Sequence, residues 1–328
     1  MKTNRERQQQ PNKKVAALPR PVVPPVQRQS VWKRKSVKIS IFVIIVLVAC
    51  FVVYKKVATP PPPVAQMSIT DKDFKNEPLE SCVDQVKLLI TPHVDDKELG
   101  SNVKEVLTKL PDYKVLFDKA QKVAKGLQID VILQDHGEAD QQARKDPRVI
   151  KSQLKVFHAL TYGNYDVVAL EGFDIDPITL DGLAHQDLEH NFKVFGTKGS
   201  LEQAREALRQ DFAIWGGMKY LIQSQSLKGM GIEYYPLNQL HRKVLDDEIS
   251  HVKGLKVNLA IEDLHNLGDK LSLLRSKLAV VKTVLKLRET ETTRGVIVIG
   301  YGHAEDISKI LQHLHISSNF FLTIDEGN

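Results

Sequence analysis

Three short segments of the sequence carry histidines and carboxylates in positions suited to chemistry. They are Gln134-Asp-His-Gly-Glu138, Glu171-Gly-Phe-Asp174 and Gly300-Tyr-Gly-His303. Imidazole and carboxylate groups together bind Mn, Zn or Fe(II), and the same groups serve as general acids and bases. The candidate metal ligands are His136, Glu138, Glu171 and His303.

Each segment follows an apolar run with the length and composition of a buried strand. The runs are Ile129–Leu133, Asp166–Leu170 and the stretch that begins at Val296. In open α/β sheets ligands bind beyond the carboxyl ends of the strands, so three strand ends could bring these side chains to one site. Each side chain also fits a simpler role, such as an ion pair, a solvated loop or a hydrogen-bonded turn. Their joint occurrence after three strands favours the shared site.

The wider pattern predicts an α/β fold with a mainly parallel central sheet flanked by helices. Between the first two strands Ile150, Leu154, Phe157 and Leu160 recur at helical spacing, as in a βαβ unit. The other predicted elements are a helical layer over 80–127, a helix from Ser200 to Trp215 that Gly216-Gly217 ends, a strand over 230–235, a long helix over 264–285, a helix over 304–311 and a last strand over 320–324.

The N-terminal part has a different composition. Residues 1–38 are basic and rich in Gln and Pro, as in a disordered tail, and residues 39–56 contain an apolar run flanked by lysines. We expect a single transmembrane helix there, because snorkelling lysines extend a short span. The excess of Lys and Arg before it predicts a cytoplasmic N-terminus, which makes the protein a single-pass protein of the cell membrane. A proline-rich linker over 57–79 would then lead to an extracytoplasmic domain over 80–328.

A cleaved lipoprotein signal is the alternative, since Leu47-Val-Ala-Cys50 matches a bacterial lipobox. The apolar run continues past Cys50, which favours the uncleaved anchor. Cys82 is the only other cysteine, so the exported domain cannot form an internal disulfide.

The charge distribution argues against nucleic acid as a partner. Residues 1–38 hold 11 of the 46 Lys and Arg but one of the 40 Asp and Glu, so the tail has a formal charge of +10 and the remainder −4. A nucleic-acid-binding domain needs a basic face, which this balance does not supply. No oligomeric state is predicted.

The motifs resemble those of the superfamily that joins ChaN-like haem-binding uptake proteins, erythromycin esterases, TraB proteins and Tiki metalloproteases. The resemblance runs from Val131 to Leu311. Its Gly-Glu-x-His, Glu-Met-Phe, Arg-Asp/Asn-x-x-Met-Ala and Gly-x-Gly-His motifs are similar to Asp135-His-Gly-Glu138, Glu171-Gly-Phe173, Arg275-Ser-Lys-Leu-Ala279 and Gly300-Tyr-Gly-His303. The sequence departs from the pattern in three places: His136 precedes Gly-Glu, Ser276 replaces the acid or amide, and Leu278 replaces methionine.

The resemblance implies a metal-assisted hydrolase of ester or peptide bonds that acts on a small molecule or a peptide. Its catalytic residues would be Glu138, Glu171, Arg275 and His303, with Arg275 as a charge partner of Glu171 or a clamp on the substrate. Water would be activated by a divalent metal (Mn, Zn or Fe) or by a carboxylate-histidine pair. The alternatives are a non-catalytic module that binds haem or another ligand, with Tyr301 as a candidate iron ligand, and a degenerate interaction domain.

Overall fold

The computed structural model describes residues 65–66, 79–97, 99–137, 145–195, 199–224 and 228–324. The predicted tail over 1–38, the predicted span over 39–56, the lipobox cysteine Cys50 and the candidate ligand Glu138 lie outside the described residues. Among the helices in the described ranges, none has the length and apolar character needed to cross a membrane.

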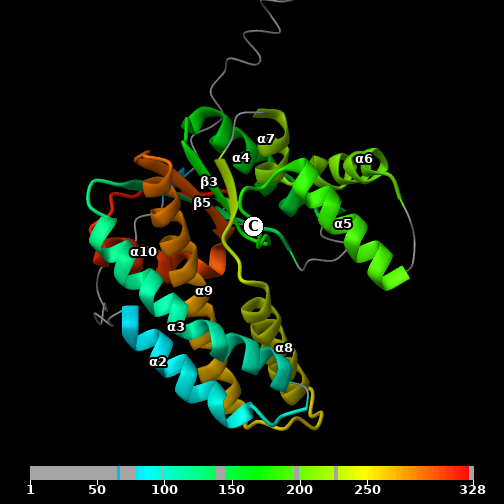
Figure 1. The fold of residues 1–328 in the computed structure, drawn as a ribbon, viewed down its shortest axis with the longest axis vertical. Coiled ribbons are helices and arrows are strands. Elements are labelled where there is room, and N and C mark those ends of the chain that lie inside the picture. Colours follow the sequence, from blue (N-terminus) through cyan, green and yellow to red (C-terminus); the bar gives the residue numbers. More distant parts are fainter. Residues whose placement is uncertain are drawn as a thin grey trace, which may run out of the picture. The chain divides into compact units, whose positions relative to one another are not determined.

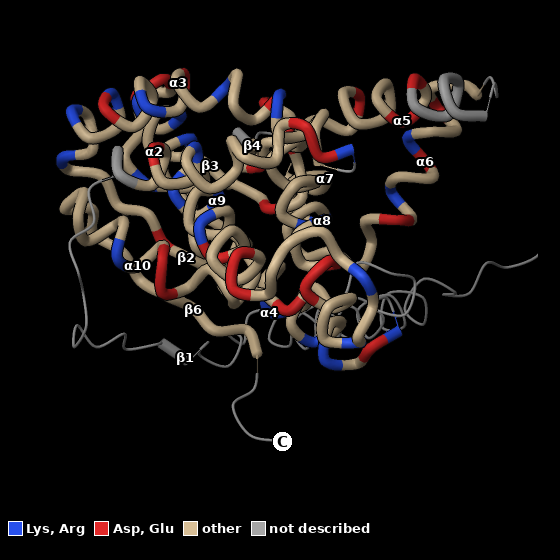
Figure 2. Tube along the Cα trace, turned by 90° about the horizontal axis from the view of Figure 1, so that it is seen from below, with Lys and Arg blue, Asp and Glu red and all other residues tan. Residues whose placement is uncertain are grey.

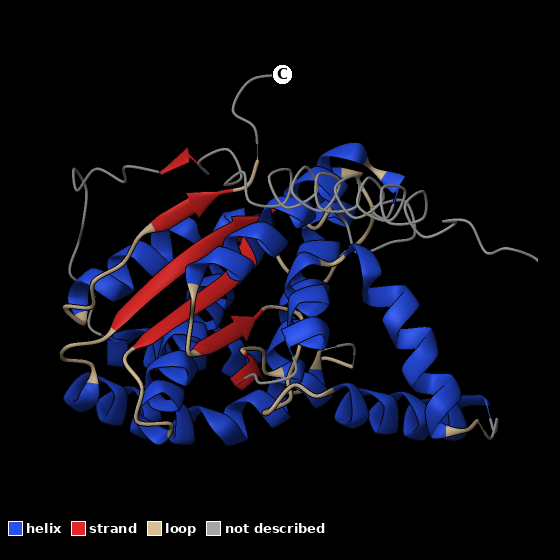
Figure 3. Cartoon of the chain, turned by 90° about the horizontal axis from the view of Figure 1, so that it is seen from above, coloured by secondary structure: helices blue, strands red, loops and turns tan. Residues whose placement is uncertain are grey.

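Five parallel strands form the central sheet, in the order β6, β2, β5, β3, β4 (Figures 1 and 3). The short strand β1 (Ala65–Gln66) pairs antiparallel with β6 at one edge. The bounds of the parallel strands are β2 Gln128–Gln134, β3 Val167–Leu170, β4 Lys228–Gly231, β5 Arg294–Gly300 and β6 Phe320–Leu322. The prediction of a mainly parallel sheet is therefore confirmed.

The strand order brings together segments that are far apart in the sequence. Strand β5 lies between β2 and β3 and pairs in parallel with both, so the two strands of the expected βαβ unit do not pair with each other. At the carboxyl ends Gln134 is in register with Gly300, and Leu170 with Val298. The three motif-bearing segments consequently leave neighbouring strands at one end of the sheet.

Helices cover both faces of this sheet (Figure 1). Within β5, Ile297 and Ile299 pack in the larger hydrophobic cluster and Val296 and Val298 in the smaller one, because successive side chains of a strand point to opposite faces. The larger cluster contains residues of α2 (Leu79–Ile90), α3 (Gly100–Val123), α8 (Tyr235–Val252), α9 (Ile261–Glu289) and α10 (Ala304–His313). The smaller one contains residues of α4 (Pro147–Gly163), α5 (Leu180–Phe195) and α7 (Gly216–Ser224), and Leu208 of α6 (Leu201–Asp211) packs against it.

Helix α4 lies where the sequence predicts it, but only part of the expected apolar face is buried. Ile150 and Leu154 are 43% and 50% exposed, whereas Val149, Val156 and Leu160 are buried. The buried face also contains two polar residues, Ser152 and Gln153, which bind the loop after β2. The apolar spacing alone could not reveal this, because it assigns only hydrophobic residues to the packed side.

Two expected boundaries are wrong. The helix that starts after the Ser200 capping box ends at Asp211, and Gly216-Gly217 begins α7 instead of ending a helix. A Cβ atom on Gly216 would lie 2.0 Å from the carbonyl oxygen of Gln153, so glycine serves a close approach to α4. The strand predicted over 230–235 is β4, which already ends at Gly231; Tyr235 belongs to α8.

Charges of both signs alternate along the outer helices, as on α6 in Figure 2. Arg205 of α6 binds Asp181 of α5 at 2.7 Å and Glu202 of its own helix at 3.1 Å. These carboxylates are well exposed, so such pairs tie α5 to α6 while adding little stability.

Candidate functional site

His136 is held at the end of β2 by the backbone of its own loop. The amide of Asp135 donates to the Ser152 hydroxyl at 2.9 Å, and the amide of Gly137 donates to the Asp135 carboxylate at 2.9 Å. Gly137 has a φ of 60°, the left-handed conformation that glycine adopts without strain. The ring Nδ1 of His136 lies 2.9 Å from the carbonyl oxygen of Gly137, which orients Nε2 toward the neighbouring strand.

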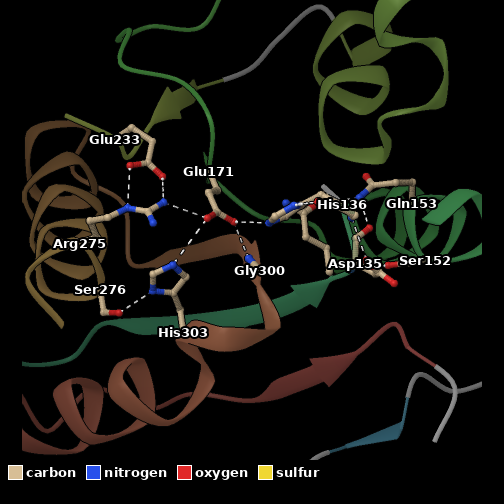
Figure 4. Close-up of polar contacts among 12 residues, drawn as sticks. Asp135, His136, Ser152, Gln153, Glu171, Glu233, Arg275, Ser276, Gly300 and His303 are labelled. Atoms are coloured by element: carbon tan, nitrogen blue, oxygen red, sulfur yellow. Dashed lines mark hydrogen bonds and ion pairs between the residues drawn. The ribbon is translucent and has the colours of Figure 1, made fainter. Parts of the chain in front are cut away.

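The side chain of Gln153 fixes this loop to the end of β2 and to α7 (Figure 4). Its amide nitrogen donates to the Gln134 side chain at 3.1 Å and to the Asp135 carbonyl at 3.0 Å. Its oxygen accepts from the amide of Gly216 at 3.0 Å. Every polar atom of this buried amide group therefore has a partner, as a rigid loop requires.

Glu171 is the first residue after β3 and lies at the centre of the candidate site (Figure 4). Its Oε2 accepts from the Gly300 amide at 2.5 Å and lies 3.6 Å from Nε2 of His136. Its Oε1 accepts from Nη2 of Arg275 at 3.2 Å and lies 3.7 Å from Nε2 of His303. One carboxylate thus joins all the predicted site residues that the structure describes except Tyr301.

Arg275 of α9 makes the ion pair with Glu171 that the resemblance implied, and it has two further partners. Its Nη2 and Nε donate to Glu233 at 2.8 and 3.4 Å, and its Nη1 lies 3.1 Å from Nδ1 of His241. The guanidinium cannot lose its proton, so Nδ1 of His241 accepts. The side chains of Arg275, Glu171 and Glu233 are only 14%, 11% and 6% exposed, which makes this a buried network.

His303 follows β5 in a short turn and is buried. Its Nδ1 lies 2.8 Å from the hydroxyl of Ser276, one residue beyond Arg275 on α9. The other ring nitrogen, Nε2, faces Glu171 at a distance too long for a direct hydrogen bond.

The groups around Glu171 give the nearby histidines different pKa values and so different protonation states. Burial raises the pKa of Glu171, but the close contact with His136 and the charges of the histidines and Arg275 outweigh it and lower this pKa to about 2. The close ion pair with Glu171 in turn raises the pKa of His136 to about 9, against the effect of burial. At neutral pH Glu171 is therefore an anion and His136 a cation.

The pKa values of His303 and His241 are shifted in the opposite direction. Burial, more than any other cause, lowers the pKa of His303 to about 4, and the charge of Arg275 adds to this while Glu171 opposes it. Burial and the charge of Arg275 likewise lower the pKa of His241 to about 4. Both rings are neutral at neutral pH, so the site combines one protonated and one unprotonated histidine on the same carboxylate. Such divergent pKa values are typical of acid-base pairs.

The donor groups around Glu171 do not fit a metal ion. Within the part of the chain that the structure describes, no three His, Cys, Asp or Glu residues are placed so as to hold one. Both oxygens of Glu171 already accept from Arg275 and Gly300, and a guanidinium at 3.2 Å disfavours a cation at the same carboxylate. Glu138, the remaining expected ligand, lies outside the described residues. Tyr301, the candidate iron ligand, lies two residues before His303 in the sequence and is 49% exposed.

Glu233, His241 and the hydroxyl of Ser276 are members of the site that the sequence did not reveal. Glu233 carried a usable signal, because it follows an apolar run as Glu171 does; the predicted strand extended past it and so placed it inside the sheet. His241 lies on α8, and only the packing of α8 against α9 brings it to Arg275.

Comparisons of this chain with protein-family models, with curated proteins and with solved structures give no match.

Proposed function

We propose that this domain hydrolyses an ester or peptide bond, with the His303–Glu171 pair activating water and His136 acting as the general acid. One observation carries the proposal: Nε2 of His303 and Oε1 of Glu171 face each other across 3.7 Å. A water oxygen can lie ~2.8 Å from both atoms, which are hydrogen-bond acceptors when the ring carries its proton on Nδ1.

The two acceptors orient such a water for attack. As the oxygen bonds to the substrate carbonyl carbon, one proton moves to Nε2 of His303 while Glu171 holds the other hydrogen. A pKa near 4 keeps the His303 ring unprotonated at neutral pH, as a base requires, although it makes the ring a weaker base than one with a pKa near 7. The adjacent Glu171 carboxylate stabilises the imidazolium that forms.

His136 supplies the proton that the leaving group needs. With its pKa raised to about 9 it is protonated at neutral pH, and its side chain is 45% exposed, so a substrate can reach it. Its Nε2 hydrogen can pass to the leaving oxygen or nitrogen as the bond to carbon breaks. Exchange with solvent then removes a proton from His303 and returns one to His136.

Two alternatives, catalysis by a divalent metal and non-catalytic haem binding, have distinct readouts. A divalent metal would be a Lewis acid at the same end of the sheet, with Glu138 among its ligands, and chelation would then abolish turnover. A haem-binding module would give a Soret band on titration, weakened in Tyr301→Phe. The described contacts of Glu171 favour the metal-free acid-base version.

The deciding experiment measures hydrolysis by the purified full-length chain across panels of esters and peptides. We expect His303→Gln to reduce kcat about 100-fold or more, the usual contribution of a general base. His265→Gln is the matched control, because this histidine of α9 is exposed and lies outside the network. Activity should survive EDTA. No turnover in any panel, or equal turnover in His303→Gln and the wild type, would refute the proposal.

We also propose that the site works outside the cytoplasm, tethered by a helix over residues 39–56. The apolar run and its lysine flanks support this. Protease accessibility of the C-terminal domain in intact cells tests it.

A further inference from the structure

The hydroxyl of Ser276 lies between His303 and a second carboxylate, the half-buried Asp306. Its Oγ is 2.8 Å from Nδ1 of His303, 3.1 Å from the carbonyl oxygen of Ser272 and 3.4 Å from Oδ2 of Asp306. Ser276 is fully buried in α9, and Asp306 lies in the first turn of α10. Two helices thus meet at the atom of His303 that points away from Glu171.

A count of hydrogens decides how these groups bond. The hydroxyl has one hydrogen, whereas the Ser272 carbonyl and an ionised Asp306 can only accept. A hydrogen bond to a carboxylate is stronger than one between neutral groups, so the hydroxyl hydrogen is directed toward Asp306 and the Ser272 carbonyl. The contact between Oγ and Nδ1 then needs a hydrogen from the ring.

We propose that Ser276 and Asp306 are positioning residues that hold neutral His303 as its Nδ1–H tautomer and so leave Nε2 unprotonated toward Glu171. This inference rests on the proposed function, since the tautomer matters because it makes Nε2 the basic atom. It adds two residues that touch neither water nor substrate and act through His303.

The arrangement also accommodates the charge that proton transfer creates. When Nε2 takes up a proton from water, Nδ1–H remains bonded to Ser276, and the new positive charge lies between the carboxylates of Glu171 and Asp306. No atom has to rearrange during the step, which is the condition for electrostatic preorganisation.

Nitrogen NMR of the full-length chain with ¹⁵N-labelled histidine tests the tautomer without any turnover. The chain has 11 histidines, so the His303 signals are assigned by their loss in His303→Gln. At neutral pH we expect a pyrrole-type Nδ1 and a pyridine-type Nε2. A pyrrole-type Nε2 in the wild-type protein would overturn the inference.

Variants then identify the cause of the tautomer. Ser276→Ala should shift His303 to the Nε2–H form or to a mixture, and Asp306→Asn, which keeps the size of the side chain, should do so in part. Ser276→Thr retains the hydroxyl and should retain the tautomer. The control is Glu305→Gln, one residue before Asp306 and exposed. If neither Ser276→Ala nor Asp306→Asn alters the His303 signals, the inference fails.

The kinetic readout separates this inference from the proposed hydrolysis. In an active enzyme, Ser276→Ala should lower kcat about tenfold with little change in KM, because substrate binding does not involve this hydroxyl. A chain that shows the Nδ1–H tautomer but hydrolyses nothing would refute the proposed function and keep the positioning role.

Discussion

Arg275 and Glu233 form a two-point ion pair, with Nη2 and Nε of the guanidinium 2.8 and 3.4 Å from the two carboxylate oxygens. This pairing fixes the plane of the guanidinium, so that Nη2 also reaches Glu171. Glu233 therefore acts on the site through Arg275. Because the three groups are buried, removing one charge leaves the others without compensation.

Replacing Arg275 by methionine should destabilise the domain strongly. The change leaves the carboxylates of Glu171 and Glu233 buried without their cation, which typically costs 3–5 kcal/mol. Urea unfolding followed by circular dichroism measures it. The control is Arg209→Met in α6, whose ion pairs are exposed, and a similar loss in both variants would contradict the buried network.

Gly300→Ala should disrupt the site, whereas Gly302→Ala should not. A Cβ atom on Gly300 would lie 2.8 Å from Nε2 of His136 and 3.3 Å from Oε2 of Glu171, but one on Gly302 meets no atom within 4 Å. We expect Gly300→Ala to cost about 1–3 kcal/mol of stability and to lower the pKa of His136, because the added methyl group pushes the ring from Glu171. NMR titration and urea unfolding of both variants check this. An equal pKa of His136 and an equal stability in the two variants would contradict it.

Glu171→Gln should return the pKa of His136 toward ordinary values. In the wild type the close ion pair with the Glu171 carboxylate is the main cause that holds this pKa at about 9. Without the negative charge the pKa of His136 should fall toward its ordinary value near 6.5, because burial lowers it and only the Gly137 carbonyl and Asp135 still raise it. Histidine NMR titration measures the shift, with Glu202→Gln on α6 as a control that should leave it unchanged. An unaltered titration of His136 in Glu171→Gln would show that another group holds its proton.

His241→Asn should reduce the loss of stability in acid. The folded pKa of His241 is about 4, below the value near 6.5 expected in the unfolded chain, so the unfolded state binds more protons between these values. The unfolding free energy of the wild type should therefore fall as the pH drops from 6.5 through 4. Asparagine removes this titration and can still accept from Arg275.

The size of the effect follows from the shift in pKa. Between pH 7.5 and pH 4 the unfolding free energy should decrease by roughly 2–3 kcal/mol less in His241→Asn than in the wild type. His303 has the same direction of shift, so part of the decrease should persist. His265→Asn, at an exposed position, should keep the full decrease, and an identical decrease in His241→Asn would disprove the assignment.

Local patterns were sufficient for β2, β3 and β5 and for the residues that follow these strands. The β-branched runs predicted β2, β3 and β5, and the alternating leucines predicted α9, because burial on a sheet or along a helix imposes those periods on the sequence. The boundary of β4 was wrong because Ile232 and Tyr234 continue the apolar run beyond the last residue of the strand. That error kept Glu233 inside a strand and hid its role.

The sequence by itself determined which side chains stand at the ends of the strands: His136, Glu171 and His303. The order of the strands in the sheet was decided only by tertiary structure, since any parallel strand can pair with any other through backbone hydrogen bonds. Inserting β5 between β2 and β3 brings both histidines to Glu171. The packing of α8 against α9 then adds Arg275 and His241, the segment between β4 and α8 adds Glu233, and burial there sets which histidine carries a proton. Burial and charge depend on residues distant in the chain, so no local pattern could contain them.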